Sequence, residues 1–246
     1  MDFPKILYDD KDFLVVYKPY GMLTHGTGRG DKDFLESEFK ESLTDWVLKR
    51  YPETANVGDD PVLRPGVVHR LDRDTSGVIV LAKNQESFLF LKNLFKERKV
   101  DKKYIAIVFG KINPKDGVID MPIGLKSGTT KRTVFSKTAK MMKEAVTEYK
   151  TLKTLEDGKN TFSFIELKPL TGRTHQLRVH LNSINHPVAG DLLYGGKKKC
   201  KESSVFFGNS RLFLHARSLE FTDMSGKRIK VEIDPPGVFR EALDRF

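Results

Sequence analysis

The sequence predicts an α+β protein in which antiparallel sheet dominates, and three observations support this fold class. Short apolar runs have the length of strands, turn-forming residues separate consecutive runs, and few segments repeat apolar residues at helical spacing. With 246 residues, 39% of them apolar, the chain can bury one substantial core or two smaller ones. We expect one domain over residues 1–246, built from two subdomains around a central cleft.

The first 100 residues predict a hairpin, a loop, a helix, a strand and a second helix, in that order. Residues 6–21 contain two apolar runs around the polar turn Asp9-Asp10-Lys11, whereas residues 25–42 are rich in glycine and charge and predict a loop. Ser42 is a suitable cap for a helix through Arg50. Residues 77–83 predict a buried strand, and the helical spacing of Phe88, Leu91 and Phe95 predicts a helix that ends near residues 96–99.

The remaining segments predict mostly strands. Residues 103–111 alternate with apolar side chains on both faces, which indicates a central strand. Further strands are expected at residues 145–155, 162–167, 212–221 and 228–233, with turns at Asp157-Gly158 and Ser225-Gly226. The basic run Lys197-Lys-Lys-Cys-Lys201 predicts a solvated loop.

Composition limits the classes of function. Lys and Arg number 43 against 33 Asp and Glu, a formal charge of +10, which favours a polyanionic partner such as nucleic acid, although a basic enzyme without such a partner fits the charge equally well. The single cysteine, Cys200, excludes an internal disulfide and a cysteine-rich zinc site. The sequence shows neither a secretory signal nor a membrane-spanning stretch, so we expect a cytoplasmic protein; we also expect a monomer.

Two polar clusters stand out between apolar segments. Residues 66–77 place two carboxylates, two guanidiniums, an imidazole and two hydroxyls beside predicted sheet, where such groups need partners or a function. Residues 171–180 open a predicted helix whose Leu177, Leu181 and Ile184 form an apolar stripe. Arg178 lies at the border of that stripe, from which a guanidinium can pair with a carboxylate such as Asp72.

The segment His69-Arg-Leu-Asp-Arg-Asp-Thr-Ser-Gly77 resembles the catalytic HRLDxxTSG signature of RluA-type pseudouridine synthases. Other stretches resemble the family in the expected order, namely Lys18–Gly21, Lys103-Tyr104, Gly172–His180, His186–Asp191 and Leu214–Ala216. The resemblance implies the pseudouridine synthase fold, a long and mostly antiparallel mixed sheet bent around a cleft and flanked by helices. It also implies an enzyme that isomerises uridines of rRNA or tRNA without a metal or other cofactor.

The same resemblance implies a role for each matching residue. Asp72 is the essential carboxylate, which attacks the ribose or promotes its rearrangement, and Arg178 pairs with it and keeps it charged. Tyr104 stacks against the target base and assists proton transfer at C5. Arg70 enters the space that the everted nucleotide leaves. Leu177 packs beside the uracil, although ordinary core packing explains it equally well.

Other polar residues have less specific interpretations. The stretch 126–137 interleaves cations with glycine and hydroxyls, so it is either a clamp for RNA phosphates, with Lys131 and Arg132 as the contacts, or a solvated loop. His69 is expected to be structural, and the spacing of His175 and His180 on a helix is poor for one metal ion.

Two expectations concern the protein as a whole. Many relatives carry an N-terminal S4-type RNA-binding domain, whereas here the resemblance begins within the first ten residues, so we expect no such domain. A second class of function keeps the fold without the reaction, as a catalytically silent RNA-binding or ribosome-assembly factor. The intact Asp72, Tyr104 and Arg178 favour the enzyme.

Overall fold

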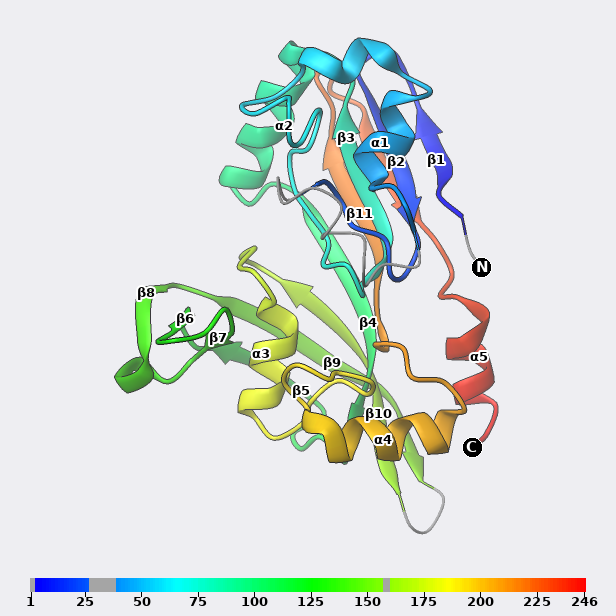
Figure 1. Ribbon diagram of the computed structural model, residues 1–246. Coiled ribbons are helices and arrows are strands. Elements are labelled where there is room, and N and C mark those ends of the chain that lie inside the picture. Colours follow the sequence, from blue (N-terminus) through cyan, green and yellow to red (C-terminus); the bar gives the residue numbers. More distant parts are fainter. Residues whose placement is uncertain (1–2, 27–38, 157–159) are drawn as a thin grey trace. The chain divides into compact units, whose positions relative to one another are not determined.

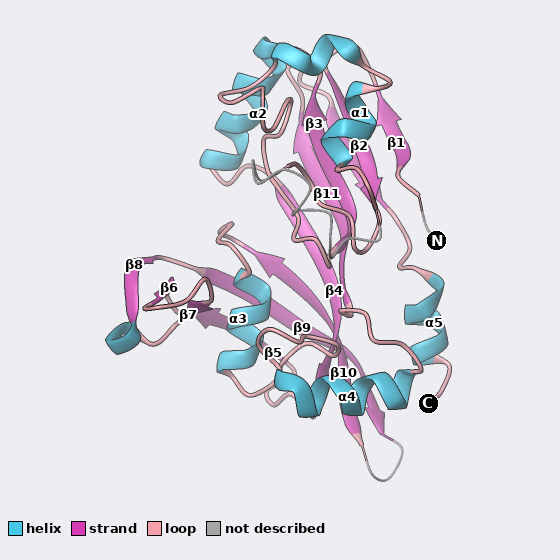
Figure 2. Ribbon diagram, in the orientation of Figure 1, coloured by secondary structure: helices cyan, strands magenta, loops and turns pink. Residues whose placement is uncertain are grey.

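The computed structural model describes residues 3–26, 39–156 and 160–246. Most of the predicted loop at 25–42 and the predicted turn at Asp157-Gly158 lie outside these residues. The chain divides into two compact units (Figure 1): the first comprises Met1–Lys102 and Ala216–Ile233, and the second comprises Lys103–His215 and Asp234–Phe246. Strands make up most of the regular structure of each unit (Figure 2), which confirms the predicted α+β class.

The sheet of the first unit has the strand order β1-β2-β3-β11, with β12 paired to β11. Its strands are β1 (Lys5–Asp9), β2 (Phe13–Lys18), β3 (Ser76–Ala82), β11 (Leu214–Thr222) and β12 (Arg228–Glu232). The predicted hairpin at the start is confirmed, because β1 and β2 pair antiparallel and the Asp10 carboxylate accepts the N–H groups of Asp12 and Phe13 in the turn. The β11–β12 turn at Ser225-Gly226 is also confirmed, since the Gly226 N–H donates to the Asp223 carbonyl.

Two α-helices and a short 3-10 helix, Pro52–Asn56, complete the first unit. Helix α1 (Leu43–Leu48) begins at the predicted cap, where Ser42 and Asp45 form a reciprocal capping box. It ends two residues before the predicted Arg50. Helix α2 (Gln85–Lys96) is capped by Asn84, and its buried face includes the predicted Phe88 and Leu91.

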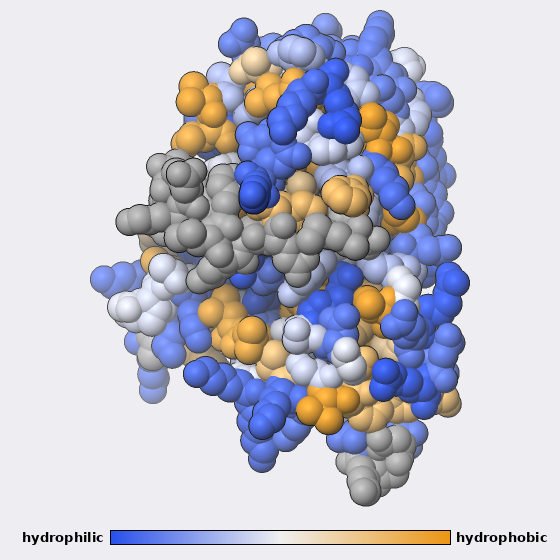
Figure 3. Space-filling view, turned by 45° about the vertical axis from the view of Figure 1, so that its right-hand side comes forward, coloured by the Kyte–Doolittle hydropathy of each residue, from blue (hydrophilic) through white to orange (hydrophobic). Residues whose placement is uncertain are grey.

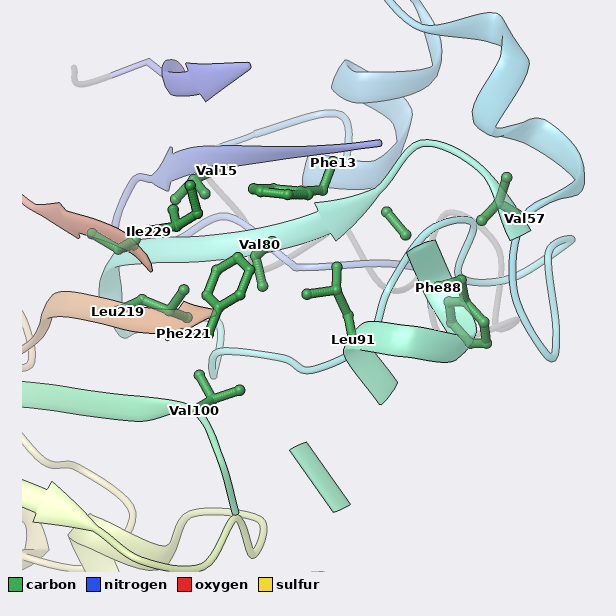
Figure 4. Packing of buried hydrophobic residues seen from close by; sticks show 12 residues of the cluster. Phe13, Val15, Val57, Val80, Phe88, Leu91, Val100, Leu219, Phe221 and Ile229 are labelled. Atoms are coloured by element: carbon green, nitrogen blue, oxygen red, sulfur yellow. The ribbon is translucent and has the colours of Figure 1, made fainter. Parts of the chain in front are cut away.

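The core of the first unit lies on one face of the sheet (Figure 4). Phe13 and Val15 of β2, with Val80 of β3, pack against Leu91 of α2 and Phe221 of β11. Every residue of β2 and β3 is buried, so the opposite face is covered as well. Continuous apolar strands of this kind are typical of sheets covered on both sides, which explains the confirmed strand prediction for residues 77–83.

The main sheet of the second unit has the strand order β4-β10-β9-β5. Its strands are β4 (Asp101–Phe109), β5 (Asp116–Asp120), β9 (Val146–Glu156) and β10 (Thr161–Pro169). The predicted central strand, β4, is confirmed. It pairs with β10 along one edge, and along the other edge the Ile107 N–H donates to the Phe213 carbonyl while the Ile107 carbonyl accepts the Ala189 N–H. A separate small sheet, with the order β7-β6-β8, contains β6 (Ile123–Lys126), β7 (Arg132–Thr133) and β8 (Ala139–Lys143), and the 3-10 helix Ser136–Thr138 precedes β8.

Three helices belong to the second unit: α3 (Gln176–Ser183), α4 (Gly196–Phe207) and α5 (Gly237–Leu243). The predicted solvated loop at residues 197–201 is wrong, because these residues form the start of α4. Cys200, Ser203 and Phe207 recur at spacings of three and four and give this helix a buried stripe, while its lysines lie on the exposed side.

The surface of the described residues is mostly polar. On the face drawn in Figure 3, hydrophilic residues predominate and hydrophobic residues form small groups. Every helix in the described part of the chain is too short or too polar to cross a lipid bilayer.

Candidate active site

The backbone on either side of Asp72 is fixed by the segment that follows β2. The Thr24 hydroxyl donates to the carbonyl of Leu71 at 2.8 Å, and the Gly21 N–H donates to the carbonyl of Arg73 at 3.0 Å. The Asp72 carbonyl itself accepts the N–H of Thr75, which closes a tight turn before β3 begins. Since the residues before and after Asp72 are both tied down, its carboxylate is presented from a fixed backbone.

Lys18 is the central anchor of this turn. It is fully buried, and its ammonium group donates to the carbonyls of Pro19 at 3.0 Å, Met22 at 2.7 Å and Arg73 at 3.0 Å. A buried ammonium group is tolerated because these carbonyls replace its hydration shell. The sequence identified Lys18 only as part of a family motif; its contact with Arg73 explains why that motif accompanies Asp72.

Gly77 completes the polar segment by allowing close approach of β3 to β11. Its φ is +124°, and a Cβ atom built on it would lie 2.1 Å from the carbonyl oxygen of Ala216. Only glycine satisfies both the backbone angle and the space. The Asp72 side chain is partly exposed, so its carboxylate can be reached from solvent.

His69 interacts as a structural histidine. Its Nε2 accepts the Val80 N–H at 3.1 Å, and its ring stacks on Phe95 with a centroid distance of 4.4 Å. Burial lowers the pKa of His69 from 6.5 to about 3, and the positive charge of Lys102 contributes a smaller part of this shift. His69 is therefore neutral at physiological pH and fastens the start of the polar segment to β3.

Arg70 is exposed, as an arginine that contacts RNA would be. Its Nη1 lies 3.3 Å from Nε2 of His25, which is partly buried. Burial lowers the pKa of His25, and the Arg70 charge acts in the same direction. A neutral His25 can accept a hydrogen bond from the Arg70 guanidinium at Nε2, whereas a protonated His25 would repel it.

In the second unit, side chains of the segment 171–180 anchor α3 to strand β9. The Gln176 side-chain amide donates to the Val146 carbonyl, and its oxygen accepts from the Thr171 hydroxyl. His180 lies between the Thr147 hydroxyl and the Met121 carbonyl, at 2.9 Å from each, and burial lowers its pKa. These contacts account for the polar residues of this segment and fix the helix that carries Leu177 and Arg178.

Arg178 forms a buried, bidentate ion pair with Asp191. Its Nε and Nη2 each donate to a carboxylate oxygen of Asp191 at 2.8 Å, and both side chains are buried. The Asp191 Oδ1 atom also accepts the N–H groups of Leu193 and Tyr194 at 3.0 Å. The predicted pairing of Arg178 with Asp72 stays a prediction. The sequence alone assigned no role to Asp191. The available signal was its position directly after the apolar segment 187–190, because a carboxylate that is buried with such a segment needs a cation as its partner.

Tyr194 contacts Arg178 of this pair and two further residues of the same unit. The Arg178 guanidinium lies 5.2 Å from the centre of the Tyr194 ring, and the tyrosine hydroxyl lies 2.8 Å from Nδ1 of His175. The same hydroxyl accepts the backbone N–H of Arg132 at 3.1 Å. Lys131 is anchored next to it, because its ammonium donates to the Leu193 carbonyl at 3.1 Å. The structure thus groups three predicted site residues, Lys131, Arg132 and Arg178, around one tyrosine.

The other predicted residues of this unit lie on regular elements. Tyr104 is partly exposed on β4, opposite Leu167 of β10. Leu177 is 7% exposed, and this burial agrees with core packing and with packing beside a base alike. In the described part of the chain, no group of His, Cys, Asp or Glu has an arrangement that could hold a metal ion.

Residues 121–143, here called the basic arm, carry the small three-stranded sheet. The arm contains six cations and no Asp or Glu, namely Lys126, Lys131, Arg132, Lys137, Lys140 and Lys143. Two apolar side chains on it are largely exposed, Phe135 at 67% and Met141 at 76%. Part of the predicted solvated loop is therefore sheet, with cations and an aromatic ring open to solvent.

Comparison with known proteins identifies the family of the chain. The model of the RNA pseudouridylate synthase family matches residues 12–183. An uncharacterized RNA pseudouridine synthase of Aquifex aeolicus is 35% identical over 237 residues, which cover 96% of this chain and 70% of that protein. The ribosomal large subunit pseudouridine synthase D of Borreliella burgdorferi is 38% identical over 190 residues, or 77% of this chain and 54% of that protein.

A solved structure is similar as well. Human RNA pseudouridylate synthase domain containing 1 has a TM-score of 0.74 and 29% identity, and the match covers 95% of this chain and 84% of that one. The chain belongs to the RNA pseudouridine synthase family and is an RluA-type member of it. The enzymes of this family are isomerases. The family resemblance inferred from the sequence is thereby confirmed.

Proposed function

We propose that the protein isomerises specific uridines of RNA to pseudouridine, with Asp72 as the catalytic carboxylate. Large-subunit ribosomal RNA is the first substrate to test, because one similar protein is named for it, and tRNA is the second. The observation that carries the proposal is the turn at Asp72, which Lys18, Gly21 and Thr24 hold from both sides. Such anchoring orders a reacting group before the substrate binds.

The proposed reaction needs no external reagent. The bond between ribose C1′ and uracil N1 breaks, the base turns, and a bond between C1′ and C5 forms. The C5 proton is lost and N1 gains one, so the atoms balance. The Asp72 carboxylate acts on the ribose while the glycosidic bond is broken, and Tyr104 stacks on the base and assists removal of the C5 proton.

The remaining site residues position the carboxylate and the RNA. Arg178 orients the Asp72 carboxylate, an assignment supported by the resemblance of residues 172–180 to the family. Leu177 lines the uracil site, and Arg70 occupies the stack that the everted nucleotide leaves.

The basic arm is proposed to bind the RNA backbone. Its cations suit phosphates, with Lys131 and Arg132 as the contacts, and the exposed ring of Phe135 suits an unpaired base. The binding should weaken steeply as salt is raised, since each neutralised phosphate releases counterions.

The test is a map of pseudouridines in total RNA, read as carbodiimide-dependent stops of reverse transcription. Cells with the gene, without it, and with it restored as wild type or Asp72→Asn are compared. We expect one or more stops to vanish with the gene and to return only with the wild-type protein. Identical maps in all four strains would favour a silent RNA-binding factor, whereas restoration by Asp72→Asn would show that Asp72 is not the essential carboxylate.

A further inference from the structure

We propose that Tyr194 is a positioning residue that couples the basic arm to Arg178. This inference rests on the proposed function, since it gives the arm and the arginine roles in one reaction. The structure offers two separate sets of contacts on the same side chain: the ring faces the buried ion pair, and the hydroxyl faces the arm.

The ring side is fixed by Asp191. One carboxylate oxygen, Oδ1, accepts from Nη2 of Arg178 and from the backbone N–H of Tyr194, so the arginine and the tyrosine share a single acceptor. The guanidinium then lies 5.2 Å from the ring centre, within the range of a cation–π contact. Replacing the ring with a smaller apolar side chain would open space directly beside Arg178.

The hydroxyl side holds the arm. Because the Arg132 N–H donates to the tyrosine oxygen, the hydroxyl proton remains available to His175 Nδ1. His175 has a φ of +58° and precedes α3, so the hydroxyl also steadies a residue in a left-handed conformation at the start of the arginine-bearing helix. Strand β7 is only two residues long, which makes each contact to the rest of the unit important for its position.

The two sets of contacts can be separated by mutation. Tyr194→Phe removes the hydroxyl bonds and keeps the ring, so it should release the arm while Arg178 stays in place. Tyr194→Leu removes both. The matched control is Tyr51→Phe, which deletes a comparable hydroxyl bond, to Asp9 at 2.6 Å, far from these residues in the sequence and within the first unit.

The experiment measures kcat and KM of the purified full chain on ribosomal RNA from cells that lack the gene, together with thermal unfolding. For Tyr194→Phe we expect KM to rise at least threefold with kcat within twofold of wild type. For Tyr194→Leu we expect the same rise in KM and a further loss of tenfold or more in kcat. Tyr51→Phe should match wild type in both constants.

A purely structural role gives a different pattern, because partial unfolding removes active enzyme and so lowers kcat without a change in KM. That pattern, or a Tyr194→Phe variant with wild-type constants, overturns the inference. Filter binding of the same RNA provides a second reading: Tyr194→Phe should bind at least threefold more weakly than Tyr51→Phe. If wild type binds but does not isomerise any RNA, the proposed function fails, whereas equal binding by the two variants refutes the coupling itself.

Discussion

The carboxylate of Asp191 binds the guanidinium of Arg178 through two hydrogen bonds of 2.8 Å, and the side chains of both residues are buried. Two parallel bonds define the plane of the guanidinium as well as its position. The arginine that the family resemblance assigns to catalysis is thus held by a second residue of its own unit.

Breaking this pair should be costly. Asp191→Asn removes the charge that accepts two hydrogen bonds from a buried guanidinium, so we expect the free energy of unfolding to fall by about 3–5 kcal/mol in urea denaturation. The control is Glu232→Gln, which breaks the half-exposed 2.9 Å pair with Arg217 and should cost less than about 1 kcal/mol. Equal losses for the two variants would mean that the buried pair adds little to stability.

Lys18→Met should destabilise the first unit and disturb the turn at Asp72. The substitution keeps most of the side-chain volume but removes the ammonium donor from the carbonyls of Pro19, Met22 and Arg73. The Arg73 carbonyl keeps the Gly21 N–H, and each buried group left unsatisfied costs about 1–3 kcal/mol. We expect a loss of roughly 3 kcal/mol or more in unfolding free energy and a lower kcat in the folded fraction. Lys92→Met, which removes an exposed lysine paired with Asp59, should change stability by less than about 1 kcal/mol. A fully active and stable Lys18→Met variant would refute the anchoring role.

Gly77→Ala tests the close approach of β3 and β11. The added Cβ would lie 2.1 Å from a backbone oxygen, so the strands must separate, and the φ of +124° adds strain. Gly128→Ala is a matched control, because Gly128 also has a positive φ, +70°, but nothing lies within 4 Å of the added atom. Thermal unfolding should show a large drop for Gly77→Ala and a loss of about 1 kcal/mol for the control. Similar losses would indicate that backbone strain alone, and not contact with β11, requires glycine at position 77.

His69 should make the fold sensitive to acid. Its pKa is about 3 in the folded protein and 6.5 when unfolded, so between these values the unfolded chain binds the additional proton. Stability therefore falls as the pH is lowered from 6.5 toward 3, by at most about 1.4 kcal/mol per pH unit for this residue. His69→Gln, whose side-chain oxygen can still accept the Val80 N–H, should show a shallower slope in urea unfolding between pH 6.5 and 4.5. Parallel curves for wild type and variant would mean that folding does not lower the pKa of His69.

Much of the fold followed from local patterns. The strands β2, β3 and β4 each contain a continuous apolar run, and Ser42 and Asn84 stand where helices begin, so short stretches of sequence carried enough information. The small sheet and α4 were not predicted. Strand β6 is only four residues long and β8 has no buried residue, and the lysines of α4 obscured the stripe formed by Cys200, Ser203 and Phe207.

The candidate site shows the same division. Asp72 was identifiable because its motif is contiguous, and Arg178 because a charged residue bordered an apolar stripe. The partners Asp191 and Tyr194 could not be identified from the sequence. Periodicity predicts which face of a helix is buried, but not which side chain from another segment packs against that face. The roles of Lys18 and His69 likewise depend on backbone atoms brought close only by folding.

The most direct test of the account compares Asp72→Asn with Asp74→Asn as purified proteins. The substrate is ribosomal RNA from cells without the gene, labelled with tritium at C5 of uridine, because formation of the C5–C1′ bond releases that hydrogen to water. Asp74 is a matched carboxylate in the same segment, partly exposed and paired with Arg73 at 3.0 Å. We predict tritium release by wild type, release within about tenfold of it by Asp74→Asn, and a loss of roughly 10⁴-fold or more for Asp72→Asn, with RNA binding retained. Release by Asp72→Asn at a rate similar to wild type would contradict the central claim.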